Sequence, residues 1–378
     1  SLSESIISEN SELVSYEKDV FNNTDKKTIY IPEKMSQLKD NWCNGLKYFK
    51  DIKVSPKNKF FKYIDDVLLV GKTDEKSDNY DILYFVNPRV KQIIIPSNIK
   101  YIKPNAFQFC AKLQTIEIPS DSQIKSFYKI FTTFTSNSNI FIPSQVSEFE
   151  EGWCYAITYK EINIIISPEN KFFKCINDNL IVGKSNKDSD EYDSLYFVNS
   201  NASSVVIIPS FIKYIKPYAF LHCNSLDTIE FQQNSLLQTI ESNVFARLDA
   251  NYIVIPKSVK NICDFAFCNS KIHSLKFQEG SEIVSIGKSA FEGTCITTID
   301  IPPSVKVIKE KAFYRCSQLE SINFSEDSEL TSISISAISN SHIKVFCIPP
   351  KLENLIYEDD SFLDELPNII ISPKNKNF

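Results

Sequence analysis

The sequence reads IIPSFIKYIKPYAFLHCNSLDTI from Ile207 to Ile229, and the same pattern of residue types recurs along the chain. Ile94 to Ile116 reads IIPSNIKYIKPNAFQFCAKLQTI, and Asp300 to Ile322 reads DIPPSVKVIKEKAFYRCSQLESI. A second version of the unit alternates with the first, for example SEIVSIGKSAF from Ser281 to Phe291. Repetition at a period of about 23 residues is typical of a solenoid, in which each unit packs mainly against its two neighbours.

Each unit contains a stretch in which apolar and polar residues alternate, as in Ile229-Glu230-Phe231. Such a period of two predicts a half-buried β-strand, and the proline that often follows ends it because proline lacks a backbone donor. Strands of consecutive units should be parallel, since each begins after a full circuit, and the winding should be right-handed. The spacing in Ala219 to Cys223 predicts one helical turn. The predicted fold is therefore an α/β repeat, a right-handed solenoid with a parallel β-sheet and short helical turns.

A longer unit occurs twice, from Ser55 to Asn87 and from Ser167 to Asn199. In each copy two alternating runs flank a charged loop, which predicts β-hairpin insertions over about residues 57–87 and 169–199. We expect residues 1–378 to form a single continuous solenoid. The chain begins and stops inside units, and we therefore expect it to be a fragment of a longer array.

Composition narrows the classes of function. The chain of 378 residues has 47 acidic and 41 basic residues, a net charge of −6, and no basic stretch, which argues against nucleic-acid binding. No apolar run reaches the roughly 18–20 residues that span a bilayer. The first residues lack the features of a signal peptide, but there is no initiator methionine, so a removed leader remains open. With only seven glycines, the turns should use Asn, Asp, Ser and Pro.

The ten cysteines do not form a site. Cys110, Cys223 and Cys316 occupy one repeat position, three residues after a phenylalanine, and this predicts small core side chains. Cys43 and Cys154 follow tryptophan in matching pairs, which again indicates packing. No Cys-x-x-Cys spacing points to zinc, and we expect no disulfide among the repeat cysteines.

Neither histidines nor carboxylate clusters predict chemistry. His222, His273 and His342 lie in different units without a partner in a catalytic motif, so we expect solvated or packing histidines. The loops 74–78 and 187–193 are rich in carboxylates, but their interleaved lysines favour solvated hairpin tips over a cation site. We therefore expect no catalytic residue, no cofactor and no metal.

The outward residue of each strand is the best candidate for a binding site. Equivalent residues of parallel strands lie side by side, so they form a row along one face of the sheet, which we expect to be concave. Exposed apolar members favour contact with a partner, whereas the alternative is that hairpins or neighbouring rungs cover them. Lys53 and Cys347 also occupy this position. The candidate contact residues are Tyr30, Ile94, Glu117, Phe141, Ile165, Ile207, Glu230, Val254, Lys276, Asp300 and Asn323.

The pattern I-P-x-x-V-x-x-I-x-x-x-A-F-x-x-C-x-x-L-x-x-I resembles the BspA-type leucine-rich repeat family over essentially the whole chain. The family's glycine after the second isoleucine is present as Gly287 but is replaced by Lys216, Asp264 or Lys309 elsewhere. One unit carries the match at Ile208, Pro209, Ile212, Ile215, Ala219, Phe220, Cys223, Leu226 and Ile229. The resemblance implies a leucine-rich-repeat fold and a surface or secreted protein of anaerobic bacteria or parasitic protists. It also implies a role in adhesion or host signalling, without shared catalytic residues.

These observations predict a non-enzymatic protein-binding module, a cell-surface adhesin or antigen that contacts host or neighbouring-cell proteins, including extracellular matrix. Stacked rungs would hold the contact residues rigidly, so that little entropy is lost on docking. An intracellular scaffold is the alternative, favoured by unpaired cysteines and the missing leader. An enzyme would require a convergent histidine and carboxylate pocket. The sequons at Asn22, Asn201 and Asn323 arise readily by chance in a chain rich in Asn and Ser, so they are weak support for secretion.

Overall fold

The computed structural model describes residues 11–22, 28–45, 51–103, 105–124, 126–127, 138–149, 162–199, 202–221, 223, 226–356 and 367–378. The chain divides into two compact units, Ser1–Lys174 and Cys175–Phe378, hereafter unit 1 and unit 2. Each consists of short parallel strands that repeat in chain order, as the sequence predicts. That the whole chain forms one continuous array stays a prediction.

Unit 1 carries two rows of parallel strands, one longer and one shorter. The longer strands have one buried face and one outward face, because Ile alternates with polar or exposed residues in them. They are β2 (Thr28–Ile31), β4 (Asp51–Val54), β8 (Gln92–Ile94), β10 (Thr115–Glu117), β12 (Ser138–Ile142) and β14 (Ile162–Ile166). The shorter strands are β1 (Ser15–Tyr16), β3 (Gln37–Leu38), β9 (Tyr101–Ile102), β11 (Ser126–Phe127) and β13 (Glu148–Phe149). Strands β8, β10, β12 and β14 form one sheet.

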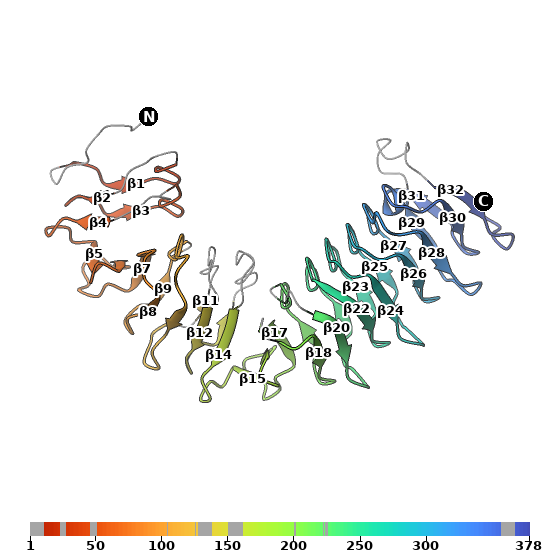
Figure 1. Ribbon diagram of the computed structural model, residues 1–378, viewed down its shortest axis with the longest axis horizontal. Helices are drawn as coiled ribbons and strands as arrows, with labels where there is room; N and C mark the ends of the chain where they lie inside the picture. The colour runs from red at the N-terminus through yellow and green to blue at the C-terminus, as the bar shows by residue number, and fades with distance from the viewer. Residues whose placement is uncertain are drawn as a thin grey trace. The chain divides into compact units, whose positions relative to one another are not determined.

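Unit 2 repeats this arrangement, and its strands follow one another in chain order (Figure 1). The longer strands are β18 (Val205–Ile208), β20 (Leu226–Phe231), β22 (Ala250–Ile255), β24 (Ser274–Phe277), β26 (Thr298–Ile301), β28 (Ser321–Phe324), β30 (Val345–Ile348) and β32 (Asn368–Ile371). The shorter strands are β19 (Tyr214–Ile215), β21 (Thr239–Ile240), β23 (Asn261–Ile262), β25 (Ser285–Ile286), β27 (Val307–Ile308), β29 (Ser332–Ser334) and β31 (Asn354–Ile356). The last six of these form one parallel sheet.

Antiparallel strands occur in the two longer sequence units. In unit 1, β6 (Leu68–Gly71) pairs antiparallel with β5 (Phe61–Ile64) and with β7 (Ile82–Val86), and β7 then pairs parallel with β9 of the next rung. The second copy repeats this, because β16 (Leu180–Gly183) pairs antiparallel with β17 (Ser194–Val198), which pairs parallel with β19. The second copy also contains β15 (Phe173–Ile176). Each insertion is thus tied to the row of shorter strands.

The expected helical turns are β-turns instead. In one rung, the Ala106 amide donates to the Lys103 carbonyl at 3.1 Å, and the Cys110 amide donates to the Phe107 carbonyl at 3.1 Å. The residue before Ala106 has a positive φ of 66°, which interrupts a right-handed helix. Among the described residues the only helix is the short 3-10 helix η1 (Ile335–Ile338).

Residues other than glycine occupy most of the left-handed backbone positions, as the scarcity of glycine predicts. Asn and Asp occur there often, since their side chains tolerate this conformation. The bulky Phe109, Tyr218 and Phe265 also occur there, with φ of 68°, 63° and 61°. A left-handed residue with a Cβ costs about 1–2 kcal/mol. Stacking of the rungs therefore imposes the turn geometry where local preference opposes it.

A ladder of phenylalanine rings forms the centre of unit 2. Neighbouring ring centroids lie 4.9–5.3 Å apart, and every ring is at most 1% exposed. The ladder consists of Phe220, Phe245, Phe267, Phe291 and Phe313. The sequence predicts equivalent environments for Phe220 and Phe313, and the ladder confirms this. Phe107, predicted to be equivalent, is 1% exposed in the core of unit 1.

The repeat cysteines are core side chains, as predicted. Cys110, Cys223 and Cys316 are all buried, and the Cys316 thiol donates to the Phe291 carbonyl of the preceding rung at 2.9 Å. Burial raises the pKa of Cys110 to about 12 and that of Cys316 to about 11. Cys43 is buried too, which confirms its packing role, while Cys154 lies outside the described residues.

A buried asparagine links each Ser-Pro-x-Asn turn to the rung before it. The Asn58 amide donates to the carbonyls of Pro32 and Met35 at 2.6 and 2.9 Å, and its oxygen accepts from the amides of Phe60 and Phe61 at 2.8 Å. Asn170 and Asn375 make equivalent contacts. All hydrogen-bonding groups of this buried side chain are thereby satisfied.

Candidate functional site

In unit 1 the predicted contact row is exposed on the strand face. The side chains of Ile94, Phe141 and Ile165 are 60%, 37% and 40% exposed. Glu117 lies opposite Ile94 in the register, and Phe141 lies opposite Ile165. Large apolar side chains that remain this open are typical of contact surfaces.

Tyr30, the first predicted member of the row, lines a hollow in unit 1 of about 810 Å³. It is half-buried and lies opposite Lys53 in the register of β2 and β4. Tyr63 and Tyr80 line the same hollow. Burial raises the pKa of Tyr63 to about 12, and its hydroxyl donates to the Asp66 carbonyl at 2.9 Å. This hollow therefore presents three tyrosine side chains beside charged side chains.

In unit 2 the predicted row is also outward-facing, but it is more polar. Ile207 is 46% exposed and lies opposite Glu230 in the register. Lys276 lies opposite the half-buried Val254. In the next pair, Asp300 lies opposite Asn323, whose amide donates to the Asp300 carboxylate at 2.8 Å.

A groove that the sequence interpretation missed borders the row of unit 2. It comprises two hollows of about 260 and 790 Å³, which adjoin because Gln278 lines both. Half-buried phenylalanines alternate with buried prolines from successive rungs along its apolar side, and we call this surface the Phe/Pro groove. Its defining residues are Phe231, Pro256, Phe277, Pro302 and Phe324. The sequence contained one signal for this groove. Strands that end in Phe alternate with strands that end in Ile-Pro.

Negative charge prevails along the Phe/Pro groove. Glu230, Glu279 and Asp300 line it, and Lys276 is the one basic side chain among its lining residues. Glu230, Glu279 and Lys276 form no ion pair with any side chain in the described ranges. Their charges are therefore available to a partner.

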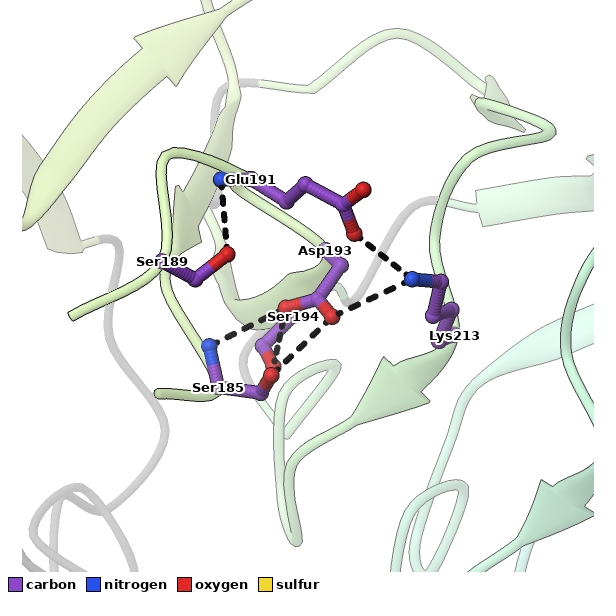
Figure 2. Close-up of polar contacts among 6 residues, drawn as sticks. All are labelled: Ser185, Ser189, Glu191, Asp193, Ser194 and Lys213. Carbon is purple, nitrogen blue, oxygen red and sulfur yellow. Dashed lines mark hydrogen bonds and ion pairs between the residues drawn. The ribbon is translucent and has the colours of Figure 1, made fainter. Parts of the chain in front are cut away.

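Figure 2 shows a polar cluster that holds the charged loop 187–193 of the second longer unit. Asp193 accepts from the amide and the hydroxyl of Ser185, both at 3.0 Å. Lys213 lies 3.8 Å from the Asp193 carboxylate and 2.6 Å from that of Glu191. The loop was predicted to be a solvated tip, but Asp193 at its end is buried. It anchors the insertion to the following rung through Lys213.

Unit 1 contains the equivalent cluster around Asp81. This carboxylate accepts from the Thr73 amide and hydroxyl at 2.9 and 2.8 Å, and the Lys100 ammonium lies 3.3 Å away. Burial alone would raise the pKa of Asp81. The hydrogen bonds from Thr73 and the charge of Lys100 outweigh burial, and the pKa lies below its usual value.

Replacing Asp81 with asparagine is expected to weaken the acid dependence of stability. A pKa lower in the folded than in the unfolded chain stabilises the fold above the unfolded pKa of about 3.9, and this gain is lost as the pH falls through the folded pKa. Urea unfolding between pH 7 and pH 3 should therefore show a steeper loss for the native chain than for D81N. Asp74→Asn in the exposed loop is the control, and an identical pH profile for D81N and the native chain would contradict the role of Asp81.

The histidines and sequons that the structure describes lie at the surface. His273 and His342 are exposed, while His222 lies outside the described residues. Asn22 and Asn323 are exposed, and Asn201 is not described. In the described part of the chain, no group of three or more His, Cys, Asp or Glu side chains is placed to hold a metal ion.

None of the helices in the described ranges has the length and apolar character needed to cross a bilayer.

Comparison with known proteins gives a family match. Residues 83–179, 163–253 and 238–365 match the model of the BspA type leucine rich repeat region, in six copies. No curated protein matches the chain.

Solved structures share the fold at low sequence identity. A leucine rich cell surface protein from Faecalibacterium prausnitzii is 17% identical with a TM-score of 0.50, and the match covers 94% of this chain and 86% of that one. The pneumococcal vaccine antigen PcpA is 14% identical with a TM-score of 0.51, over 95% and 85% of the two chains. A leucine-rich repeat protein from Eubacterium ventriosum is 15% identical with a TM-score of 0.51, over 80% and 97%.

Proposed function

The chain belongs to the BspA-type leucine-rich repeat family, and from this premise we propose that it is a non-enzymatic protein-binding module of a cell-surface or secreted protein. Its partner is a protein on a host or neighbouring cell or in the extracellular matrix. Two of the solved structures with this fold are described as a cell surface protein and a vaccine antigen, which is consistent with such a location.

The exposed row of strand residues supports this proposal most directly. Parallel pairing fixes the position of each outward side chain relative to its neighbours, and Ile94, Phe141, Ile165 and Ile207 remain open to solvent. A surface held rigidly by the backbone loses little conformational entropy when a partner docks. The prevailing negative charge of the row in unit 2 disfavours nucleic acid as the partner.

An intracellular scaffold is the second candidate, and the free cysteines favour it. Cys175 and Cys347 are exposed and unpaired, and exposed free thiols are more common in reducing compartments. The same strand face would serve as the binding surface. Locating the protein in intact cells with an antibody, with and without permeabilisation, distinguishes the two candidates.

Reversing charge at Glu230 and Asp300 together is expected to weaken partner binding at least about ten-fold without unfolding the protein. Both side chains are exposed, so their replacement by lysine removes no core contact. The measurement is saturable binding of the labelled full chain to intact cultured epithelial cells, with melting temperature as the check on folding.

The matched control reverses Glu282 and Glu353, two exposed acids of unit 2 outside the groove lining. Cells stripped of surface protein by protease provide the control for the class of partner. Equal binding by both double variants, or undiminished binding to stripped cells, would contradict the proposal.

A further inference from the structure

We infer that the Phe/Pro groove binds a proline-rich peptide segment in the polyproline II conformation that carries basic residues. This inference rests on the proposed protein-binding function and specifies its partner. Three properties of the groove support it, namely its spacing, its chemistry and its charge.

The spacing of the phenylalanines matches the pitch of a polyproline II helix. Phe231 and Phe277 are separated by one intervening strand, β22, which pairs with the strands of both. Neighbouring strands lie about 4.8 Å apart, so the two side chains project at an interval of about 9.6 Å. Phe324 lies a further two strands along, because β24 neighbours β26 and β26 pairs with β28.

A polyproline II helix repeats every three residues, or about 9.3 Å, so one of its edges stays in step with Phe231 and Phe277, whose spacing is set by hydrogen-bonded strands. An extended β-strand presents the same side about every 6.8 Å, and an α-helix has a pitch of about 5.4 Å. Neither would stay in register along the groove. The periodicity therefore favours a polyproline II ligand over the other regular conformations.

The groove has the surface chemistry that proline-rich segments bind. Such segments dock against aromatic side chains and lose little entropy, since their conformation is largely formed before binding. Phe231, Phe277 and Phe324 pack against the core of unit 2, which limits their motion. The side-chain Oε1 of Gln278 accepts from the Lys257 amide at 3.0 Å, and that of Gln232 accepts from the Ser210 amide at 3.1 Å, so the adjoining turns are also fixed.

Charge complementarity decides the composition of the segment. Three carboxylates, those of Glu230, Glu279 and Asp300, face the ligand beside a single ammonium group at Lys276. Arginine or lysine next to the prolines would neutralise this excess. An acidic proline-rich segment would be repelled.

The test is a calorimetric titration of the full chain with a fifteen-residue probe that has proline at every third position and an arginine near each end. Two matched peptides replace either the prolines with alanine or the arginines with glutamate. We expect each replacement to weaken binding by about ten-fold or more. Equal affinity for the alanine peptide would overturn the inference, since conformation would then play no part.

The matched pair of protein variants is Phe277→Leu and Phe211→Leu. Leucine keeps an apolar side chain at position 277 but removes the aromatic face, whereas Phe211 is 44% exposed and lies outside the groove. We expect F277L to bind the probe about ten-fold more weakly while its thermal unfolding shows that it stays folded, and F211L to bind as the native chain does.

Equal binding by the two leucine variants would refute the assignment of the groove. If none of the peptides binds while the Glu230 and Asp300 reversal still reduces cell binding, the proline-rich partner is refuted and the proposed function stands. If cell binding is absent as well, both fail.

Discussion

Phe291→Ala is expected to lower the free energy of unfolding of unit 2 by about 3–5 kcal/mol. The Phe291 ring is fully buried between Phe267 and Phe313, with centroids 5.0 and 5.3 Å away. Alanine would leave a cavity between two rungs, and in a repeat protein each rung is stabilised mainly by its immediate neighbours. The loss should therefore extend to the packing of both adjacent rungs. Urea unfolding followed by far-ultraviolet circular dichroism measures the effect.

Phe211→Ala is the control for the ladder, because Phe211 is exposed on the same unit and its truncation should cost no more than about 0.5 kcal/mol. Phe291→Leu should lie between the two, since leucine fills part of the cavity. Equal destabilisation by the alanine variants at positions 291 and 211 would show that the stacked rings do not carry the stability of this unit.

Asn58→Ala is expected to destabilise unit 1 by about 3–5 kcal/mol, although it removes only a small polar side chain. Five backbone groups would lose a hydrogen bond, namely the carbonyls of Pro32, Glu33 and Met35 and the amides of Phe60 and Phe61. The Pro32 carbonyl keeps one bond, from the Met35 amide at 3.2 Å. Each buried backbone group left without a hydrogen bond costs about 1–3 kcal/mol, and partial access of water recovers some of the total. Chemical unfolding with a probe on unit 1 measures the loss.

Asn58→Asp tests the same set of hydrogen bonds at nearly constant side-chain volume. Its carboxylate could still accept from the two amides but could not donate to the carbonyls, so we expect a loss of stability at neutral pH that is partly recovered when the acid is protonated. Asn139→Ala is the surface control, since Asn139 is exposed on β12. An Asn58→Ala variant as stable as Asn139→Ala would show that the hydrogen bonds of Asn58 do not stabilise unit 1.

The strands, the outward row and the core cysteines were predictable because each follows from a local pattern. Alternation around Ile229 and Ile299 selects a strand and its buried face from neighbouring residues alone. The identical spacing of Phe and Cys in successive units then places Cys110, Cys223 and Cys316 in the interior.

The helical turns were predicted wrongly because the local pattern does not show the hydrogen bonds between rungs. The Ala-Phe spacing fits a helix, but the residue before it adopts a left-handed conformation, even where that residue is Tyr218 or Phe265. Hydrogen bonds to the next rung maintain this conformation, as where the Phe265 amide donates to the Lys288 carbonyl at 2.8 Å. The sequence of a single unit contains no sign of that bond.

The sequence by itself determined the repeat, the strand faces and the family to which the protein belongs, since these depend on the order of residue types within about two dozen positions. Only the tertiary structure decided which side chains bridge rungs, such as Asn58 and Asp193, and how Phe231, Phe277 and Phe324 come together as a groove. Those contacts join residues about one or two full circuits apart. Which residues meet depends on how each circuit closes and stacks on the next. Packing between rungs fixes that register.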